Sequence, residues 1–221
     1  MSIKKLITSR YSVRSFIDKK VSLELIKEIL KTANSAPSGG NIQPWKIYVV
    51  SNNSYKELTT QAVSNFDNGV QEAIDYEIYP KPLADEYKKR RSECASDMYE
   101  AISIERDDID SRMKQIRENF NFFGAPVGMI VTIDKSFAPN GWGHVGMFLQ
   151  NLWLAAIEEG LGVCLQESWS IYPKTVKQVV KHPDNEMVWC GIAIGYPNTE
   201  DPINQYRTSR DSIDTFATFI D

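Results

Sequence analysis

RYSVRSF at residues 10–16 and APSGGNIQPW at residues 36–45 are the two stretches of this 221-residue chain from which its architecture is best predicted. In the first stretch, Arg10, Ser12 and Arg14 occupy alternate positions, so an extended or turning backbone directs their side chains to one side. Guanidinium groups bind phosphate bidentately, and a serine hydroxyl adds a further hydrogen bond. The spacing therefore predicts a phosphate-binding site at these three residues.

The second stretch is a loop rich in residues that bend the backbone and expose its N–H groups. It contains Pro37, Ser38, Gly39 and Asn41, and it ends at Trp45, where an apolar run begins. Glycine allows positive φ and close backbone approach, and the asparagine amide both donates and accepts hydrogen bonds. These properties predict a loop that holds a polar cofactor, with Trp45 as an anchor in the core.

The ordered pair of motifs resembles the FMN-dependent nitroreductase family, and in detail its nitrobenzoate-reductase-like branch. The resemblance continues through FFGAPVGMIVTID at residues 122–134, GMFLQNLWLAAIEEGLG at 146–162 and GIAIGYP at 191–197. It leaves out a segment at about residues 66–120, where members of the family differ most. The resemblance implies an α+β, three-layer fold with a central, mostly antiparallel sheet flanked by helices, a helical insertion and an intertwined homodimer.

The resemblance also implies which residues bind FMN. They are Arg10, Ser12, Arg14, Pro37, Ser38, Gly39, Asn41, Glu167, Ser168, Arg207 and Arg210. The arginines would contact the phosphate, with Arg210 preferred over Arg207, and the loop would contact flavin, commonly from the opposite subunit. This chain departs from the family pattern at Gly39, where a second serine is common, and at Thr208, where a lysine is frequent.

No side chain is predicted to be catalytic, because FMN itself carries the hydride. The backbone of Glu167 falls where the family places an N–H group beside the hydride-accepting nitrogen of the ring. No GxGxxG motif follows a strand, so a separate dinucleotide domain is not expected, and NADH or NADPH would visit the flavin face transiently. His144 and His182 lie in no recognisable catalytic context.

The composition is that of an ordinary globular protein, with 42% hydrophobic and 24% charged residues and a net charge of −4. This charge predicts no nucleic acid or anionic membrane as a partner. No secretory signal or membrane-spanning stretch is expected, which predicts a cytoplasmic protein. The spacing of Cys94, Cys164 and Cys190 supports neither a disulfide framework nor a metal site. Residues 1–221 are expected to form a single domain.

Apolar patterns predict the secondary-structure elements of this domain. A helix should begin after Ser22 and end before Pro37. Strands are expected at residues 46–50, 127–133, 162–165 and 187–194. A helix at about residues 141–159 is apolar around much of its circumference, so it is expected to be wholly buried or shared with a second subunit.

The segment at residues 77–118 carries 20 charged side chains among its 42 residues, with no glycine and two prolines. Such a density of mixed charge is typical of a solvated helical face, so a helical excursion over the core is expected at about residues 66–120. Its tyrosines would pack beneath it or line the mouth of a pocket. At the carboxyl end, Phe216, Phe219 and Ile220 predict an arm that docks on a partner subunit.

The predicted function is an FMN-dependent NAD(P)H oxidoreductase that reduces nitroaromatic or quinone-like acceptors by ping-pong, two-electron hydride transfer. One alternative is a flavin-dependent dehalogenase, or another flavin enzyme of the same fold, in which the excursion is a lid over the substrate. A second is a flavin-binding protein without turnover, and a third is an interaction module that binds no flavin.

Overall fold

The computed structural model describes residues 2–137 and 139–220. Its α-helices are α1 (Ile3–Ser9), α2 (Leu23–Ala33), α3 (Asn52–Asp67), α4 (Asp85–Ala101), α5 (Ile109–Arg117), α6 (Trp142–Glu158), α7 (Pro173–Val180) and α8 (Ile213–Phe216). Its strands are β1 (Trp45–Val50), β2 (Val127–Asp134), β3 (Gly162–Gln166) and β4 (Glu186–Gly195). The four predicted strands are therefore present, each within a residue or two of its expected bounds.

The four strands form one sheet in the order β1-β2-β4-β3, and every pair in it is antiparallel. The central strands β2 and β4 are apolar and buried along nearly their whole length, because protein covers both faces of the sheet. The first motif extends the sheet beyond β3, through a parallel bridge between Ser12 and Val163. In this bridge the N–H group of Val13 donates to the Val163 carbonyl oxygen at 3.1 Å.

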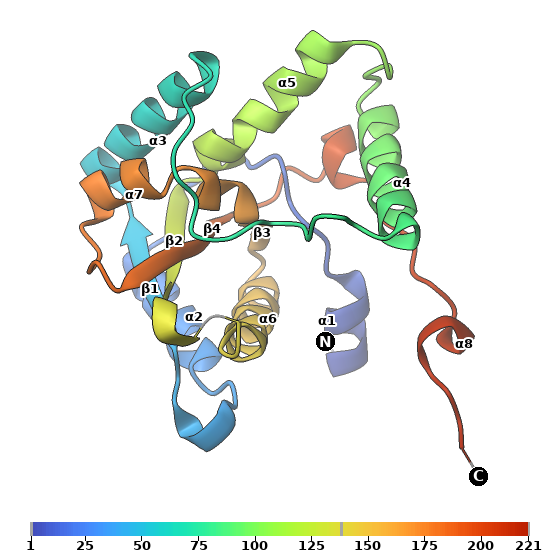
Figure 1. Cartoon of the computed structure of the whole chain (residues 1–221), viewed down its shortest axis with the longest axis horizontal. Helices are drawn as coiled ribbons and strands as arrows, with labels where there is room; N and C mark the ends of the chain where they lie inside the picture. The colour runs from blue at the N-terminus through green and yellow to red at the C-terminus, as the bar shows by residue number, and fades with distance from the viewer. Residues whose placement is uncertain (1, 138, 221) are drawn as a thin grey trace.

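Alternate residues of the central strands face two separate hydrophobic cores. Met129 and Val131 of β2 pack against α2 and α6 on one face of the sheet. Ile130 of the same strand joins the core formed with α3, α7 and the Phe122 region on the other face. Figure 1 shows the sheet between these two helical layers. The predicted α+β, three-layer architecture is confirmed.

Helix α2 begins where the sequence predicts. The Ser22 hydroxyl oxygen accepts a hydrogen bond from the N–H group of Leu25 at 3.1 Å, which satisfies one of the unpaired donors at the helix start. The apolar side of α2 buries Ile26, Ile29 and Ala33 against the core. The packing of this apolar face holds α2, which lies between the two motifs in the sequence, against the core.

Helix α6 is buried on one side only. Val145, Phe148 and Leu152 lie in the core, whereas Met147 is 38% exposed and Gly146 is exposed beside it. Of the two predicted alternatives, complete burial within one chain is therefore wrong. The exposed side of α6 is available to a second subunit. Among residues 2–137 and 139–220, no helix combines the length and the hydropathy needed to span a bilayer.

The segment predicted as a helical excursion is helical only from α4 onward. Residues 68–84 contain no helix, and they include Pro80 and Pro82, which remove backbone donors. Side-chain contacts hold this segment on the body: the Glu72 carboxylate accepts from the N–H group of Lys174 at 2.7 Å, at the start of α7. The predicted packing of tyrosines is also only partly right, since Tyr99 is buried while others, Tyr79 and Tyr87, are exposed.

Candidate functional site

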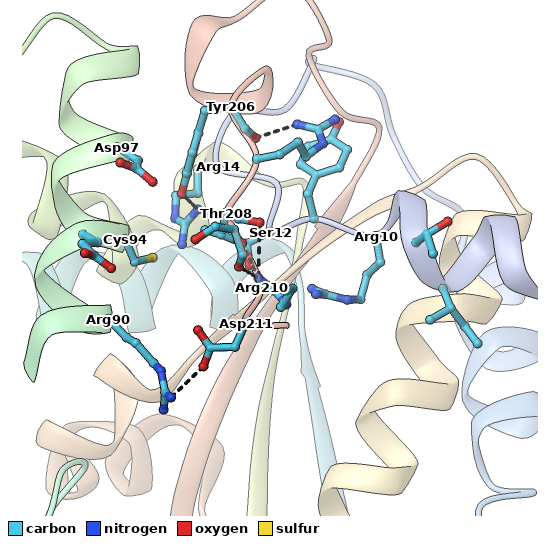
Figure 2. Close-up of a pocket in the computed structure, with 16 residues that line it drawn as sticks. Arg10, Ser12, Arg14, Arg90, Cys94, Asp97, Tyr206, Thr208, Arg210 and Asp211 are labelled. Carbon is cyan, nitrogen blue, oxygen red and sulfur yellow. Dashed lines mark hydrogen bonds and ion pairs between the residues drawn. The ribbon is translucent and has the colours of Figure 1, made fainter. Parts of the chain in front are cut away.

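A cavity of about 830 Å³ lies where three distant parts of the chain meet. One wall is the first motif, with Arg10, Ser12 and Arg14; a second is the carboxyl-terminal segment at residues 206–211; the third is α4. Figure 2 shows guanidinium groups from the first two walls converging on this space. The structure therefore brings together the two arginine-bearing elements that were predicted to share a ligand.

Four of the arginines that line the cavity have no carboxylate partner within the described part of the chain. The ion pairs found among residues 2–137 and 139–220 include none with Arg10, Arg14, Arg207 or Arg210. Partial burial lowers the pKa of the Arg10 guanidinium, and the nearby positive charge of Arg210 lowers that pKa further. Unpaired like charges held this close destabilise one another, so the site favours an anionic ligand.

Arg14 is oriented by the carboxyl-terminal segment. Its backbone N–H group donates to the Asn204 side-chain oxygen at 2.8 Å, and its guanidinium donates to the Tyr206 hydroxyl at 2.8 Å. Asn204 is buried, and its amide nitrogen donates to the carbonyl oxygens of Ser15 and Asn198 at 2.7 and 2.8 Å. The sequence analysis missed both Asn204 and Tyr206, because an asparagine in a proline-containing turn carries no signal of a long-range contact.

The other arginines are also held in place. Arg10 lies over the ring of Trp153, with its guanidinium carbon 4.4 Å from the ring centre. Arg207 lies over the ring of Tyr11 at 3.8 Å and donates to backbone carbonyl oxygens of its own segment. Arg210 donates to the Thr208 hydroxyl oxygen at 2.7 Å. Both predicted carboxyl-terminal arginines line the cavity, and Arg210 is the one whose charge reaches Arg10.

The loop of the second motif does not line this cavity within the single chain. It forms a short 3₁₀ turn at Gly39–Asn41, with positive φ at Gly40 (57°) and Asn41 (56°). A Cβ atom on Gly39 would lie 3.3 Å from the His144 imidazole Nε2, so a serine here would require this ring to shift slightly. Pro37, at the start of the loop, is likewise absent from the cavity lining.

Two residues of the second motif make contacts within the chain, outside the cavity. Trp45 is buried and stacks on Phe148, with ring centres 5.0 Å apart, so its predicted role as a core anchor is confirmed. Ser38 is occupied within the loop, since its hydroxyl oxygen accepts from the N–H group of Gln43 at 3.0 Å.

Glu167 and Ser168 begin the 3₁₀ turn Glu167–Ile171 that directly follows β3, outside the lining of the cavity. The first N–H groups of such a turn have no partner within it, which leaves them available to a ligand. Burial raises the pKa of the Glu167 carboxyl. Ser12 bridges Val163, and Glu167 follows the end of β3 four residues after Val163, which is about 13 Å at the usual rise per strand residue.

Both motifs and all four strands lie within the part of the chain that one family model matches. The Nitroreductase family model matches residues 7–196. The chain belongs to the nitroreductase family. The resemblance predicted from the motifs is confirmed.

Several members of the nitroreductase family are similar to this chain over nearly its whole length. The nitrobenzene nitroreductase of Ectopseudomonas oleovorans is 35% identical, covering 97% of this chain and 95% of that protein. The 4-nitrobenzoate reductase of Pseudomonas putida is 32% identical, and the match covers 97% of this chain and 93% of that protein. The crystal structure of an FMN and NADPH-dependent nitroreductase from sphigopyxis sp. strain HMH superposes with a TM-score of 0.96, at 33% identity and with both chains covered completely.

Proposed function

We propose that this nitroreductase-family chain is an FMN-dependent NAD(P)H oxidoreductase that reduces nitroaromatic acceptors. The observation that carries the proposal is the group of four guanidinium groups without a carboxylate partner, in the described residues, at one cavity beside β3. Phosphate is one of the anions that such planar forks bind bidentately, and its charge suits a cluster of several guanidinium groups. The nitroreductases named above, which are 32–35% identical to the chain, support the same activity.

The arrangement of these residues supports FMN as the ligand. In the proposed site Arg10, Arg14 and Arg210 would bind the phosphate and Ser12 would add a hydroxyl, while the backbone at Glu167, just past the end of β3, lies about 13 Å from the residue that Ser12 bridges. That span suits a phosphate at one end, a ribityl chain between and the ring at the other. When bound, FMN supplies two-electron hydride chemistry, so the protein contributes positioning and electrostatics.

We infer a ping-pong order for the reaction. No nucleotide-binding fingerprint of a separate domain occurs in the sequence, so NADH or NADPH and the acceptor would use the same open face in turn. The acceptors extend to quinones, because an electron-poor ring that accepts hydride at this open face can take the accompanying proton from water rather than from a side chain.

The site is completed by a second copy of the chain. The loop at residues 36–45 does not line the cavity of its own chain, and the exposed side of α6 offers a surface for a partner. The carboxyl-terminal arm stands away from the body, as Figure 1 shows for α8, and it exposes Phe216 (76%), Phe219 (76%) and Ile220 (91%). In the proposed intertwined homodimer these side chains pack on the partner.

Replacing Phe216 and Phe219 together by serine is expected to weaken the dimer. Burying one large apolar side chain contributes roughly 1.5–3 kcal/mol, so losing two should raise the dimer dissociation constant about a hundredfold or more. Sedimentation velocity over a concentration series measures the change. The matched control is Ile109→Ser, which removes an apolar side chain that is 62% exposed on α5. Equal dimer stability in the double variant and the control would contradict the docking role of the arm.

The function itself is tested on purified protein under anaerobic conditions. We expect a flavin absorption spectrum that NADH or NADPH bleaches and that 4-nitrobenzoate restores, with turnover of the reduced nucleotide. Parallel assays contain benzoquinone and iodotyrosine. Turnover with iodotyrosine alone would favour the dehalogenase alternative, and a flavin spectrum that neither nucleotide bleaches would favour a binding protein without turnover. A protein that binds no FMN would leave only an interaction module.

A further inference from the structure

The face of α4 that is turned to the cavity is polar. It consists of residues at spacings of three, four and seven, which place them on one side of a helix: Arg90, Glu93, Cys94 and Asp97. A helix that packs on a protein core carries apolar side chains at these spacings, and α4 buries only Tyr99. The inward face of α4 therefore suits contact with a polar ligand better than contact with a core.

Arg90 is held at the cavity by a residue from another wall. Its guanidinium lies 2.6 Å from the Asp211 carboxylate and 3.7 Å from the Glu86 carboxylate, and the first of these pairs is drawn in Figure 2. Both members of the Arg90–Asp211 pair are more than 40% exposed, and such pairs contribute only about 0–1 kcal/mol to stability. This ion pair therefore matters for position rather than for stability, because it connects α4 to the segment that carries Arg210.

The charges around the cavity match a phosphate. Five arginines and three carboxylates line it, which leaves an excess of two positive charges. A phosphate monoester carries about two negative charges at pH 7. Arg90 offsets the Asp211 carboxylate; without Arg90 that carboxylate would stand unpaired at the cavity and the excess would fall to one positive charge. The carboxylates of Glu93 and Asp97, on the same helix face, can accept hydrogen bonds from ligand hydroxyl groups but repel a phosphate.

We propose that Arg90 is a further phosphate-binding residue of the FMN site, positioned by Asp211, and that α4 is the wall closing the cavity over the phosphate. The inference rests on the proposed function, because it takes FMN as the ligand. It assigns a binding role to α4, within the segment predicted as a helical excursion. It also makes entry of the ligand depend on a helix with one buried side chain.

The first test compares two variants of α4 that lose the same charge. Arg90→Gln is expected to raise the FMN dissociation constant about tenfold, measured by quenching of flavin fluorescence. Lys88→Gln is the control, because Lys88 pairs with Asp85 at 2.8 Å and does not line the cavity; its dissociation constant should stay within about twofold. Thermal melts without FMN confirm that both variants fold. Equal dissociation constants for the two variants would overturn the inference.

The second test uses the thiol on α4 as a reporter. Cys94 is exposed and lines the cavity, whereas Cys164 and Cys190 are buried. Saturating FMN is expected to slow alkylation of Cys94 by N-ethylmaleimide at least fivefold, measured by intact-mass spectrometry. If the wild type binds FMN without protecting Cys94, this inference fails while the proposed function stands. If the wild type binds no FMN at all, both fail.

Discussion

Replacing Arg10 and Arg14 together by alanine is expected to raise the FMN dissociation constant by a hundredfold or more. Hydrogen bonds that involve charged groups contribute roughly 1.5–3 kcal/mol each, and each 1.4 kcal/mol is a factor of ten in affinity. Both guanidinium groups line the cavity without a carboxylate partner in the described residues. Fluorescence titration of the apoprotein with FMN measures the loss.

Two further variants separate phosphate binding from other effects. Arg14→Lys keeps the charge but loses the planar fork and the geometry of the bond to Tyr206, so it should bind FMN with intermediate affinity. Arg106→Ala removes an exposed arginine outside the cavity and should leave the affinity unchanged. If Arg10 and Arg14 could be removed without loss relative to Arg106→Ala, the phosphate site would have to lie elsewhere.

Replacing Gly191 by alanine is expected to destabilise the fold by about 3 kcal/mol or more. A Cβ atom at this position would lie 2.0 Å from the Trp169 Cδ1 atom, far inside van der Waals contact. Trp169 cannot retreat, because it is fully buried and stacks on Phe122 with ring centres 4.6 Å apart. Gly191 itself pairs with both neighbouring strands in the centre of the sheet. Thermal unfolding should show a fall in Tm of roughly 6–12 °C.

The control for this variant is Ser92→Ala, at an exposed position of α4 that does not line the cavity. It should leave Tm unchanged or raise it slightly, since alanine favours a helix over serine. In a Trp169→Leu background, which makes room beside the strand, the cost of Gly191→Ala should shrink. Additive effects of the two changes would show that the indole is not the obstacle.

Local patterns in the sequence were sufficient to predict the strands of the sheet and helix α2. The strands were predictable because apolar runs such as residues 127–133 can be buried on both faces only in a central strand. The start of α2 was predictable because Ser22 caps the helix through its own neighbours in sequence. The same applies to the glycine-rich loop, whose turn at Gly40 follows from residue type alone.

The parts of the fold and the site that were not predicted depend on contacts between residues far apart in the sequence. Asn204 binds the first motif across about 190 residues, and nothing in its neighbourhood signals this partner. Charge density predicted a solvated helix at α4, yet one polar side of α4 faces the cavity with Arg90 and Cys94. The prediction failed at residues 68–84, where single contacts such as that of Glu72 with α7 replace a helix. The cytoplasmic location and the single domain stay predictions.

The cavity joins residues 10–14 to residues 206–211, which the ribosome adds almost 200 residues later, together with Asn204. During synthesis, the early arginines therefore emerge long before the asparagine and tyrosine that hold them. If the proposed phosphate site is correct, flavin binding requires residues on both sides of the whole sheet in sequence order. A fragment that stops before residue 206 is therefore expected to bind no FMN.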